Sequence, residues 1–213
     1  MRPPQSWDKA RATLAIAAVT ALAWIVPVLL GRELDAALWA GFIPARLEGS
    51  VSADGLAPVW LTPLTATLVH GNFVHLAFNL MMLLFCGRAT EAILGARGIV
   101  ILYVVSAYVA AAAMFLADPG SVGLMIGASG AVSGVFGAYA LLFSRNRVNV
   151  AHPLLAKWLN VAWMGAAWIV LQLMFGFISS GSAQPIAVGA HIGGFFAGFA
   201  LTTPLLLLRY RKA

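Results

Sequence analysis

The chain has 213 residues, of which 62% are hydrophobic and 9% are charged, and its mean hydropathy is +0.91. These values exclude a soluble globular domain and are typical of a polytopic membrane protein, so we expect one all-α membrane domain over residues 1–213. The net charge of +6 does not indicate a nucleic-acid partner, because the basic residues cluster between apolar segments. Cys86 is the lone cysteine, which excludes a disulfide framework as well.

Six apolar segments of the sequence are candidates for crossing a bilayer, at roughly 20 residues per crossing. In chain order they cover residues 13–30, 72–93, 98–117, 129–144, 158–178 and 187–208. The fourth segment is short for a full crossing. Residues 31–71 form one long external loop, in which spaced apolar residues predict a short helix at the membrane interface. These residues are Leu34, Leu38, Trp39 and Phe42.

The basic residues predict how the segments are oriented. Eleven of the 13 lysine and arginine residues fall on one side of the six-segment arrangement, and only Arg32 and Arg46 fall on the other. The positive-inside bias makes the richer side cytoplasmic, so both termini are predicted to be cytoplasmic. One segment more or fewer would scatter the charges over both faces. Because no small-x-small cleavage site follows residue 30, we interpret the first segment as a retained signal anchor.

Four polar side chains from three segments are predicted to lie at one depth. Ser129 opens the fourth segment about 16 residues, or roughly 24 Å, from its cytoplasmic edge, and His191 lies about 18 residues, or roughly 27 Å, from the same edge. His75 and Asn79 are one i,i+4 step apart at the outer start of the second segment, so they approach the same level. Polar groups in hydrocarbon face a cavity or a partner. A hydroxyl and an imidazole in this setting indicate a nucleophile and its base.

Small residues predict that the fourth and sixth segments touch. Gly130 and Gly134 form a small-x-x-x-small ridge on the fourth segment, and Gly194 and Gly198 form one on the sixth. A hydrogen bond between an alcohol and an imidazole needs about 2.6–3.2 Å between heavy atoms, which requires such close packing. The ridges alone are common packing motifs, but here they flank the serine and the histidine.

The sequence resembles the rhomboid family of intramembrane serine proteases over about residues 58–205. The matching motifs occur in order: HLAFN at residues 75–79, GASG at residues 127–130 and AHIGG at residues 190–194. The resemblance implies a six-transmembrane-helix rhomboid-like bundle. His70 and Glu91 also stand where many members carry them.

The resemblance implies a Ser–His dyad without a carboxylate. Ser129 is then the nucleophile, and His191 is the general base that later protonates the leaving amine. The side chains of His75 and Asn79, with the backbone N–H of Ser129, would stabilise the oxyanion. A serine at a helix start also has unpaired N–H groups and the helix dipole beside it, which favour negative charge there.

The same resemblance implies what the protein acts on. Gly127 and Ala128 leave room for a substrate backbone to reach the serine, and we expect single-span membrane proteins in the lipid bilayer as substrates. No metal or other cofactor is expected. The short cytoplasmic ends favour the inner membrane of a bacterium, and the sequence leaves the oligomeric state open.

Two positions depart from the family pattern. Trp60 is followed by Leu61, where rhomboids often carry arginine, so the anchoring of the external loop is left open. Ser133 stands where many members carry an aromatic residue against the catalytic histidine, which leaves open how His191 is held.

Other polar and aromatic residues have structural interpretations. We interpret His70 as a residue that bonds the external loop, and Glu91 as one that pairs with Arg88 or contacts another helix. Aromatic residues of the fifth and second segments are candidates for a lateral substrate gate, with a lipid-facing surface as the equal alternative. They are Trp163, Trp168, Phe175, Phe177, Phe78 and Phe85.

Three other functions are weighed against proteolysis. A catalytically inactive relative that binds or escorts transmembrane helices would keep the fold without the chemistry. A small transporter is disfavoured because no inverted repeat or pair of Gly/Pro-broken helices is visible. A metalloprotease is disfavoured because the HExxH motif is absent. Each polar residue also has a simpler interpretation, such as a helix N-cap for Ser129.

Overall fold

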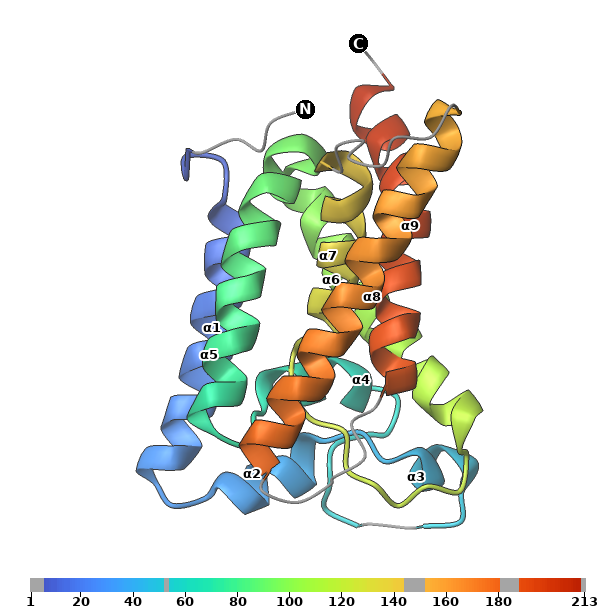
Figure 1. Ribbon diagram of the computed structural model, residues 1–213. Coiled ribbons are helices and arrows are strands. Elements are labelled where there is room, and N and C mark those ends of the chain that lie inside the picture. Colours follow the sequence, from blue (N-terminus) through green and yellow to red (C-terminus); the bar gives the residue numbers. More distant parts are fainter. Residues whose placement is uncertain (1–5, 52–53, 144–151, 181–187, 212–213) are drawn as a thin grey trace.

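The computed structural model describes residues 6–51, 54–143, 152–180 and 188–211, which form helices joined by loops (Figure 1). Within these ranges one isolated β-bridge joins Phe42 to Met125. The beginning of the first long helix and the end of the last lie at the same end of the bundle (Figure 1). Arg145 and Arg147, which the sequence places on the cytoplasmic side, lie outside the described residues.

The long helices account for the apolar segments of the sequence. They are α1 (Arg11–Leu29), α5 (Phe73–Met82), the π-helical η2 (Leu83–Gly87), α6 (Arg88–Ala117), α7 (Ser129–Phe143), α8 (Pro153–Ser180) and α9 (Val188–Tyr210). In the described part of the chain, four stretches are long and apolar enough to span a membrane: Arg11–Leu29, Phe73–Ala117, Leu154–Leu171 and Val188–Tyr210. The helix α7 has 15 residues and is shorter. The molecule is therefore a polytopic membrane bundle of helices.

The second and third predicted segments follow one another with a tight turn between them. The helical stretch is interrupted only at Gly95, where φ is +77° and ψ is 168°. Glycine adopts this left-handed φ without a steric penalty. The chain reverses direction there, so α6 runs back through the bundle and packs on α7 and α9 (Figure 1).

The external loop contains four short helical elements. They are α2 (Glu33–Ala40), α3 (Pro44–Glu48), α4 (Thr62–Thr65) and the 3₁₀ helix η1 (Ala66–Leu68). A short helix is observed at the predicted place as α2, on which Leu34 is 69% exposed and Trp39 is 48% exposed. The inclusion of Phe42 is wrong: its side chain is buried against Ala66 and Ala111, because the chain leaves α2 in an extended conformation and pairs with Met125.

Arg46 anchors the segment of the external loop that precedes α4. The Nη2 atom of Arg46, on α3, donates a hydrogen bond to the carbonyl of Ala57 at 2.9 Å. The N–H of Ala57 in turn donates to the carbonyl of Trp39 at 3.1 Å. Trp60 itself is 66% exposed. The segment before α4 is thus tied to both α2 and α3.

At the opposite end of the bundle, Glu91 caps the start of α1. Its carboxylate accepts the backbone N–H of Ala12 at 2.9 Å, and both the N–H and the hydroxyl of Thr13 at 2.7 Å. The first N–H groups of a helix have no acceptor within the helix, and a carboxylate satisfies them with favourable charge. Glu91 is only 2% exposed. Of the two predicted roles, the helix contact is the one that these hydrogen bonds support.

The end of α9 closes the same region. Arg209 donates from Nη1 to the carbonyl of Ala92 at 3.2 Å, and the Tyr210 hydroxyl donates to the carbonyl of Ile93 at 3.2 Å. A Cβ atom at Gly95 would lie 3.3 Å from the Arg209 guanidinium. The three helices α1, α6 and α9 are therefore fastened together at this end.

Glycines bring α7 into backbone contact with α9. A Cβ atom at Gly198 would collide with the carbonyl oxygen of Gly134, and one at Gly194 would collide with that of Gly130. On the α6 side of α7, a Cβ atom at Gly134 would strike the side chain of Ser106. The predicted contact between α7 and α9 is thus observed, and α6, α7 and α9 pack against one another with no room for a side chain at these glycines.

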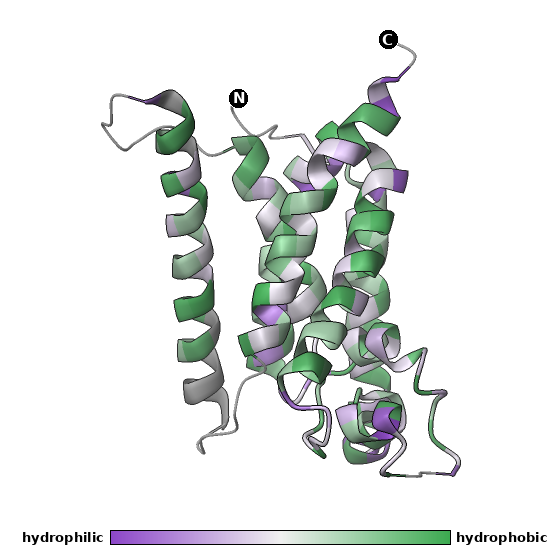
Figure 2. Ribbon diagram, turned by 90° about the vertical axis from the view of Figure 1, so that its right-hand side faces the viewer, coloured by the Kyte–Doolittle hydropathy of each residue, from purple (hydrophilic) through white to green (hydrophobic). Residues whose placement is uncertain are grey.

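The helix α8 lies at one side of the bundle in the turned view, where apolar colours dominate the long helices (Figure 2). One face of α8 packs inward through Val161, Gly165 and Trp168, which follow helical spacing. The side chain of Trp163 is 73% exposed on another face. The side chains of Phe175 and Phe177 lie outside the described residues.

We expect Glu91→Gln to lower the free energy of unfolding by about 2–3 kcal/mol, because hydrogen bonds to a charged group are lost and the amide presents a donor to buried N–H groups. The measurement is equilibrium unfolding in detergent micelles. Glu48→Gln, at an exposed acid of the external loop, serves as the control. Equal stability of the two variants would contradict the capping role.

We expect Gly198→Ala to destabilise the bundle by about 1–3 kcal/mol, because its methyl group meets the backbone of α7 and forces the helices apart. Gly189→Ala on the same helix is the matched control, since its Cβ atom would lie at an ordinary 3.5 Å from its nearest neighbour. The same unfolding assay compares the two. A Gly198→Ala protein as stable as the control would show that the close approach is dispensable.

Candidate active site

The loop before α7 fixes the position of Ser129. The N–H of Gly127 donates to the carbonyl of Ala66 at 2.8 Å, and the N–H of Ala128 donates to Nε2 of His70 at 3.3 Å. The N–H of Val132 then donates to the carbonyl of Ala128 at 2.9 Å, which opens the helix. Ser129 is therefore the first residue of α7, held from the external loop on one side and by the helix on the other.

Gly127 makes this turn possible for two reasons. Its φ of +108° is a conformation that residues with side chains rarely adopt. A Cβ atom would also lie 2.5 Å from Cε1 and 2.6 Å from Nε2 of His75. The absence of a side chain thus lets the imidazole of His75 lie directly against the backbone two residues before Ser129.

Ser129 and His191 are brought to hydrogen-bonding distance. Nε2 of His191 lies 2.8 Å from Oγ of Ser129, and the two residues are 6% and 8% exposed. In the tautomer that carries its proton on Nδ1, the imidazole accepts the hydroxyl proton at Nε2. A hydroxyl beside a neutral imidazole in a buried setting is an arrangement suited to proton transfer from the oxygen to the nitrogen.

The helix α5 presents His75 and Asn79 on one face. It begins with Asn72, whose Oδ1 accepts the N–H of His75 at 2.8 Å and caps the helix. Nδ2 of Asn79 donates to the carbonyl of His75 at 3.0 Å, which uses one of its two N–H bonds. Asn79 is 1% exposed, and its Oδ1 has no hydrogen-bond partner within the described residues. The structure places His75 against Gly127, while Asn79 is engaged with its own helix.

The start of α7 adds a favourable electrostatic field at Ser129. The first N–H groups of an α-helix have no acceptor within the helix, and the helix dipole is positive at this end. Negative charge that develops near Ser129 is therefore stabilised by groups that are already oriented.

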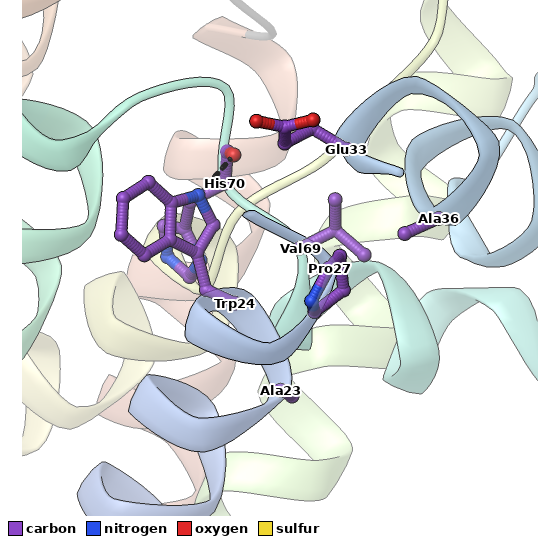
Figure 3. Close-up of a pocket in the computed structure, with 7 residues that line it drawn as sticks. All are labelled: Ala23, Trp24, Pro27, Glu33, Ala36, Val69 and His70. Carbon is purple, nitrogen blue, oxygen red and sulfur yellow. Dashed lines mark hydrogen bonds between the residues drawn. The ribbon is translucent and has the colours of Figure 1, made fainter. Parts of the chain in front are cut away.

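His70 joins three parts of the molecule around this site. Its carbonyl accepts the indole N–H of Trp24 on α1 at 2.7 Å, shown as the dashed line in Figure 3. Its ring accepts from Ala128, and its edge contacts the ring of His75 with the centroids 5.0 Å apart. Figure 3 also shows Glu33 of α2 beside the same carbonyl. His70 therefore bonds the loop before α7, which is more than the predicted contact within the external loop.

Burial, and to a lesser extent the charge of His75, lowers the pKa of His70 from 6.5 to about 3. The ring is consequently neutral at neutral pH, with a lone pair available on Nε2. This protonation state is the one that the hydrogen bond from Ala128 requires.

Ser133 occupies a position that sequence reasoning left without a role. Its Oγ donates to the carbonyl of Ser129 at 2.7 Å and accepts the indole N–H of Trp168 at 2.7 Å. The spacing of four residues from Ser129 predicts only that the two serines share a helix face. The partner on α8 could not be read from the sequence, because it depends on how two distant helices pack.

The aromatic residues considered as a gate divide into two groups. Trp168 and Phe78 are 1% and 7% exposed and stack on each other with centroids 5.8 Å apart. Trp163 and Phe85 are 73% and 56% exposed, as expected of side chains that face lipid. Within the described ranges, no group of three or more histidine, cysteine, aspartate and glutamate side chains is placed to hold a metal ion.

Comparison with known proteins points to one family. A family model for the Rhomboid domain matches residues 58–208. Rhomboid protease GluP of Bacillus subtilis (strain 168) is 31% identical over 157 residues, which cover 74% of this chain and 28% of that protein. RHOMBOID-like protein 5 of Arabidopsis thaliana is 31% identical over 181 residues, covering 84% and 53% respectively. Rhomboid-like protease 3 of Toxoplasma gondii is 27% identical over 203 residues, covering 93% and 70%.

The chain is thus shorter than these relatives. It spans about a quarter of the length of GluP and about half of the Arabidopsis protein. The matched region of this chain contains Ser129, His191, His75, Asn79 and His70.

We expect acid to destabilise the protein partly through His70. Between pH 6.5 and about 3 the unfolded chain binds a proton at this residue and the folded chain does not. The free energy of unfolding therefore falls with falling pH, by up to about 1.4 kcal/mol per pH unit. His70→Gln keeps an acceptor for the N–H of Ala128 and does not titrate, so it should show a shallower dependence.

The measurement is equilibrium unfolding at several pH values between 7 and 4, with His152→Gln as the control for loss of an exposed histidine. Identical pH slopes in the wild type and His70→Gln would contradict the buried neutral state.

Proposed function

Because this chain belongs to the rhomboid family, we propose that it is an intramembrane serine endopeptidase that hydrolyses peptide bonds in or near transmembrane segments of membrane proteins. The observation that carries this proposal is the 2.8 Å contact between Oγ of Ser129 and Nε2 of His191, buried between two apolar helices. A serine that only capped its helix would have no need of an imidazole at this distance.

In the proposed first half-reaction, Oγ of Ser129 attacks the carbonyl carbon of the scissile peptide bond while His191 takes the hydroxyl proton at Nε2. The carbonyl oxygen becomes negatively charged in the tetrahedral intermediate. The intermediate collapses when the C–N bond breaks, and His191 returns the proton to the leaving amine. An acyl-enzyme ester on Ser129 remains.

In the second half-reaction, water replaces the amine. His191 takes a proton from the water as the oxygen attacks the ester carbon, and then returns it to Oγ of Ser129. The products are a free carboxyl group, a free amine and the regenerated enzyme. No cofactor takes part in either half.

The oxyanion is assigned to donors around the start of α7. The backbone N–H of Ser129 and the side chains of His75 and Asn79 are proposed to donate to it. The dipole of α7 supports this assignment, and so does the His75 ring against Gly127. Loss of one such donor typically costs about 10²–10³ in rate. The second N–H of Asn79 is the one proposed for this bond.

The substrate is proposed to be a single-span membrane protein that enters sideways from the bilayer. Its backbone would reach Ser129 along Gly127 and Ala128, which present little side-chain bulk. A peptide bond in an intact helix cannot be attacked easily, because its carbonyl is hydrogen-bonded and enclosed by side chains. Local unwinding of the substrate near its outer end is therefore expected.

The proposed topology is a single membrane domain with six crossings and both termini in the cytoplasm. The helical stretch from α5 to Gly95 counts as one crossing, and the part of α6 after Gly95 counts as another. With the short α7 included, this gives six crossings. The charge bias of the sequence sets the orientation. We propose the inner membrane of a bacterium as the location.

We expect Ser129→Ala and His191→Ala each to lower cleavage of a single-span reporter protein in proteoliposomes by at least about 10³-fold, because either change removes one half of the proton-transfer pair. Ser50→Ala and His152→Ala are matched controls at exposed positions and should cleave as the wild type does. Cleavage retained in Ser129→Ala would end the proposal.

A fluorophosphonate probe distinguishes an enzyme from an inactive relative. The wild type should be labelled covalently at Ser129, whereas Ser129→Ala should not be labelled. A wild-type protein that is neither labelled nor active towards any reporter would support the binding or escort function instead.

A further inference from the structure

A chain of two hydrogen bonds runs from α8 to the backbone of Ser129. The indole Nε1 of Trp168 donates to Oγ of Ser133 at 2.7 Å, and that oxygen donates to the carbonyl of Ser129 at 2.7 Å. Trp168 is 1% exposed and Ser133 is fully buried. The two bonds therefore form away from water, where polar contacts are strong and unpaired groups are unfavourable.

The chemical groups themselves fix which one donates and which one accepts in each of these two hydrogen bonds. An indole N–H is only a donor, and a backbone carbonyl is only an acceptor. The hydroxyl of Ser133 has one hydrogen, so it gives that hydrogen to Ser129 and accepts from Trp168 with a lone pair. Each bond polarises the hydroxyl in the sense that strengthens the other.

The indole ring is held between α7, which carries Ser129, and α5, which carries His75 and Asn79. It stacks on Phe136 of α7 with centroids 5.0 Å apart and an interplanar angle of 28°. On α5 it stacks on Phe78 at 5.8 Å and 16°. Phe78 directly precedes Asn79 in the sequence. Trp168 is thus seated against both sides of the site.

Trp168 is also the outermost attachment of α8 in the part that the structure describes. Between it and Met174, the described side chains of α8 are exposed or half-buried. The packing of α8 onto α7 and α9 through Val161 and Gly165 lies on the other side of Trp168, further from Ser129. Among the described side chains of α8, Trp168 is therefore the one that links this part of the helix to Ser129 by hydrogen bonds.

We propose that Trp168 and Ser133 are positioning residues that hold the first turn of α7, so that Oγ of Ser129 points at His191. The two residues act through the carbonyl of Ser129 and do not touch the reacting atoms. This proposal rests on the proposed serine protease function. It assigns α8 a part in arranging the nucleophile in addition to any part in admitting substrate.

Conservative variants separate the hydrogen bonds from the packing. Trp168→Phe keeps an aromatic ring between Phe78 and Phe136 but removes the N–H. Ser133→Ala removes the middle of the chain, and Ser133→Thr retains the hydroxyl. Trp163→Phe, at a side chain of α8 that is 73% exposed, is the matched control.

The experiment measures kcat and KM for a single-span reporter in proteoliposomes, together with the rate at which a fluorophosphonate labels Ser129, below the unfolding temperature of every variant. Trp168→Phe and Ser133→Ala should each lower kcat and the labelling rate by about 3–10-fold with KM changed less than about twofold, because a misdirected nucleophile affects the chemical step. Ser133→Thr and Trp163→Phe should match the wild type.

The double variant Trp168→Phe/Ser133→Ala tests whether the two residues act as one unit. Its kcat should be no lower than that of the less active single variant, because either change alone already breaks the chain of hydrogen bonds. Multiplied losses would show independent effects and would overturn the proposal.

Two further outcomes would also overturn it. A change in KM alone would mean that Trp168 contacts substrate rather than arranging the nucleophile. Faster cleavage would mean that Trp168 only obstructs entry from the bilayer. Failure of the underlying function is distinguishable, because the wild type would then be neither labelled nor active, or cleavage would persist in Ser129→Ala, whatever the result at Trp168 and Ser133.

Discussion

The packing of α7 against α9 is the contact on which the site depends. Helices in a bilayer gain little from the hydrophobic effect when they associate, so close van der Waals contact and buried hydrogen bonds must hold them together. Gly134 and Gly198 allow one backbone to touch the other, and the Ser129–His191 bond lies on the same pair of helices toward the outer end. A single methyl group in this interface would move the hydroxyl and the imidazole apart.

The two ends of the bundle are held by different interactions. At one end, the carboxylate of Glu91 caps α1, and Arg209 reaches the carbonyl of Ala92. At the other end, His70 connects α1 to the loop that precedes Ser129. The first set of hydrogen bonds fixes helices far from Ser129, and the second fixes the backbone that leads into Ser129. A neutral imidazole suits the second role because it accepts a hydrogen bond without bringing charge into the site.

The two parts of helix α8 pack differently against the rest of the molecule. Its inner part packs on α7 and α9, whereas toward its outer end the last buried contact that the structure describes is Trp168. That side chain contacts a phenylalanine from each of two helices and a serine one turn after Ser129. A helix attached in this way transmits its position to the site through a few atoms, which makes those atoms sensitive to small substitutions.

The sequence by itself determined the apolar helices, the convergence of Ser129, His191 and His75, and the small residues that allow it, because these depend on local composition and on spacing along a helix. It did not determine that Gly95 alone makes the turn between the second and third segments, that Phe42 is buried or which residues Glu91 contacts. Nor did it reveal that Trp168 bonds Ser133. Each of these depends on which residue from a distant segment occupies the neighbouring space, and only the packing of the folded chain decides that.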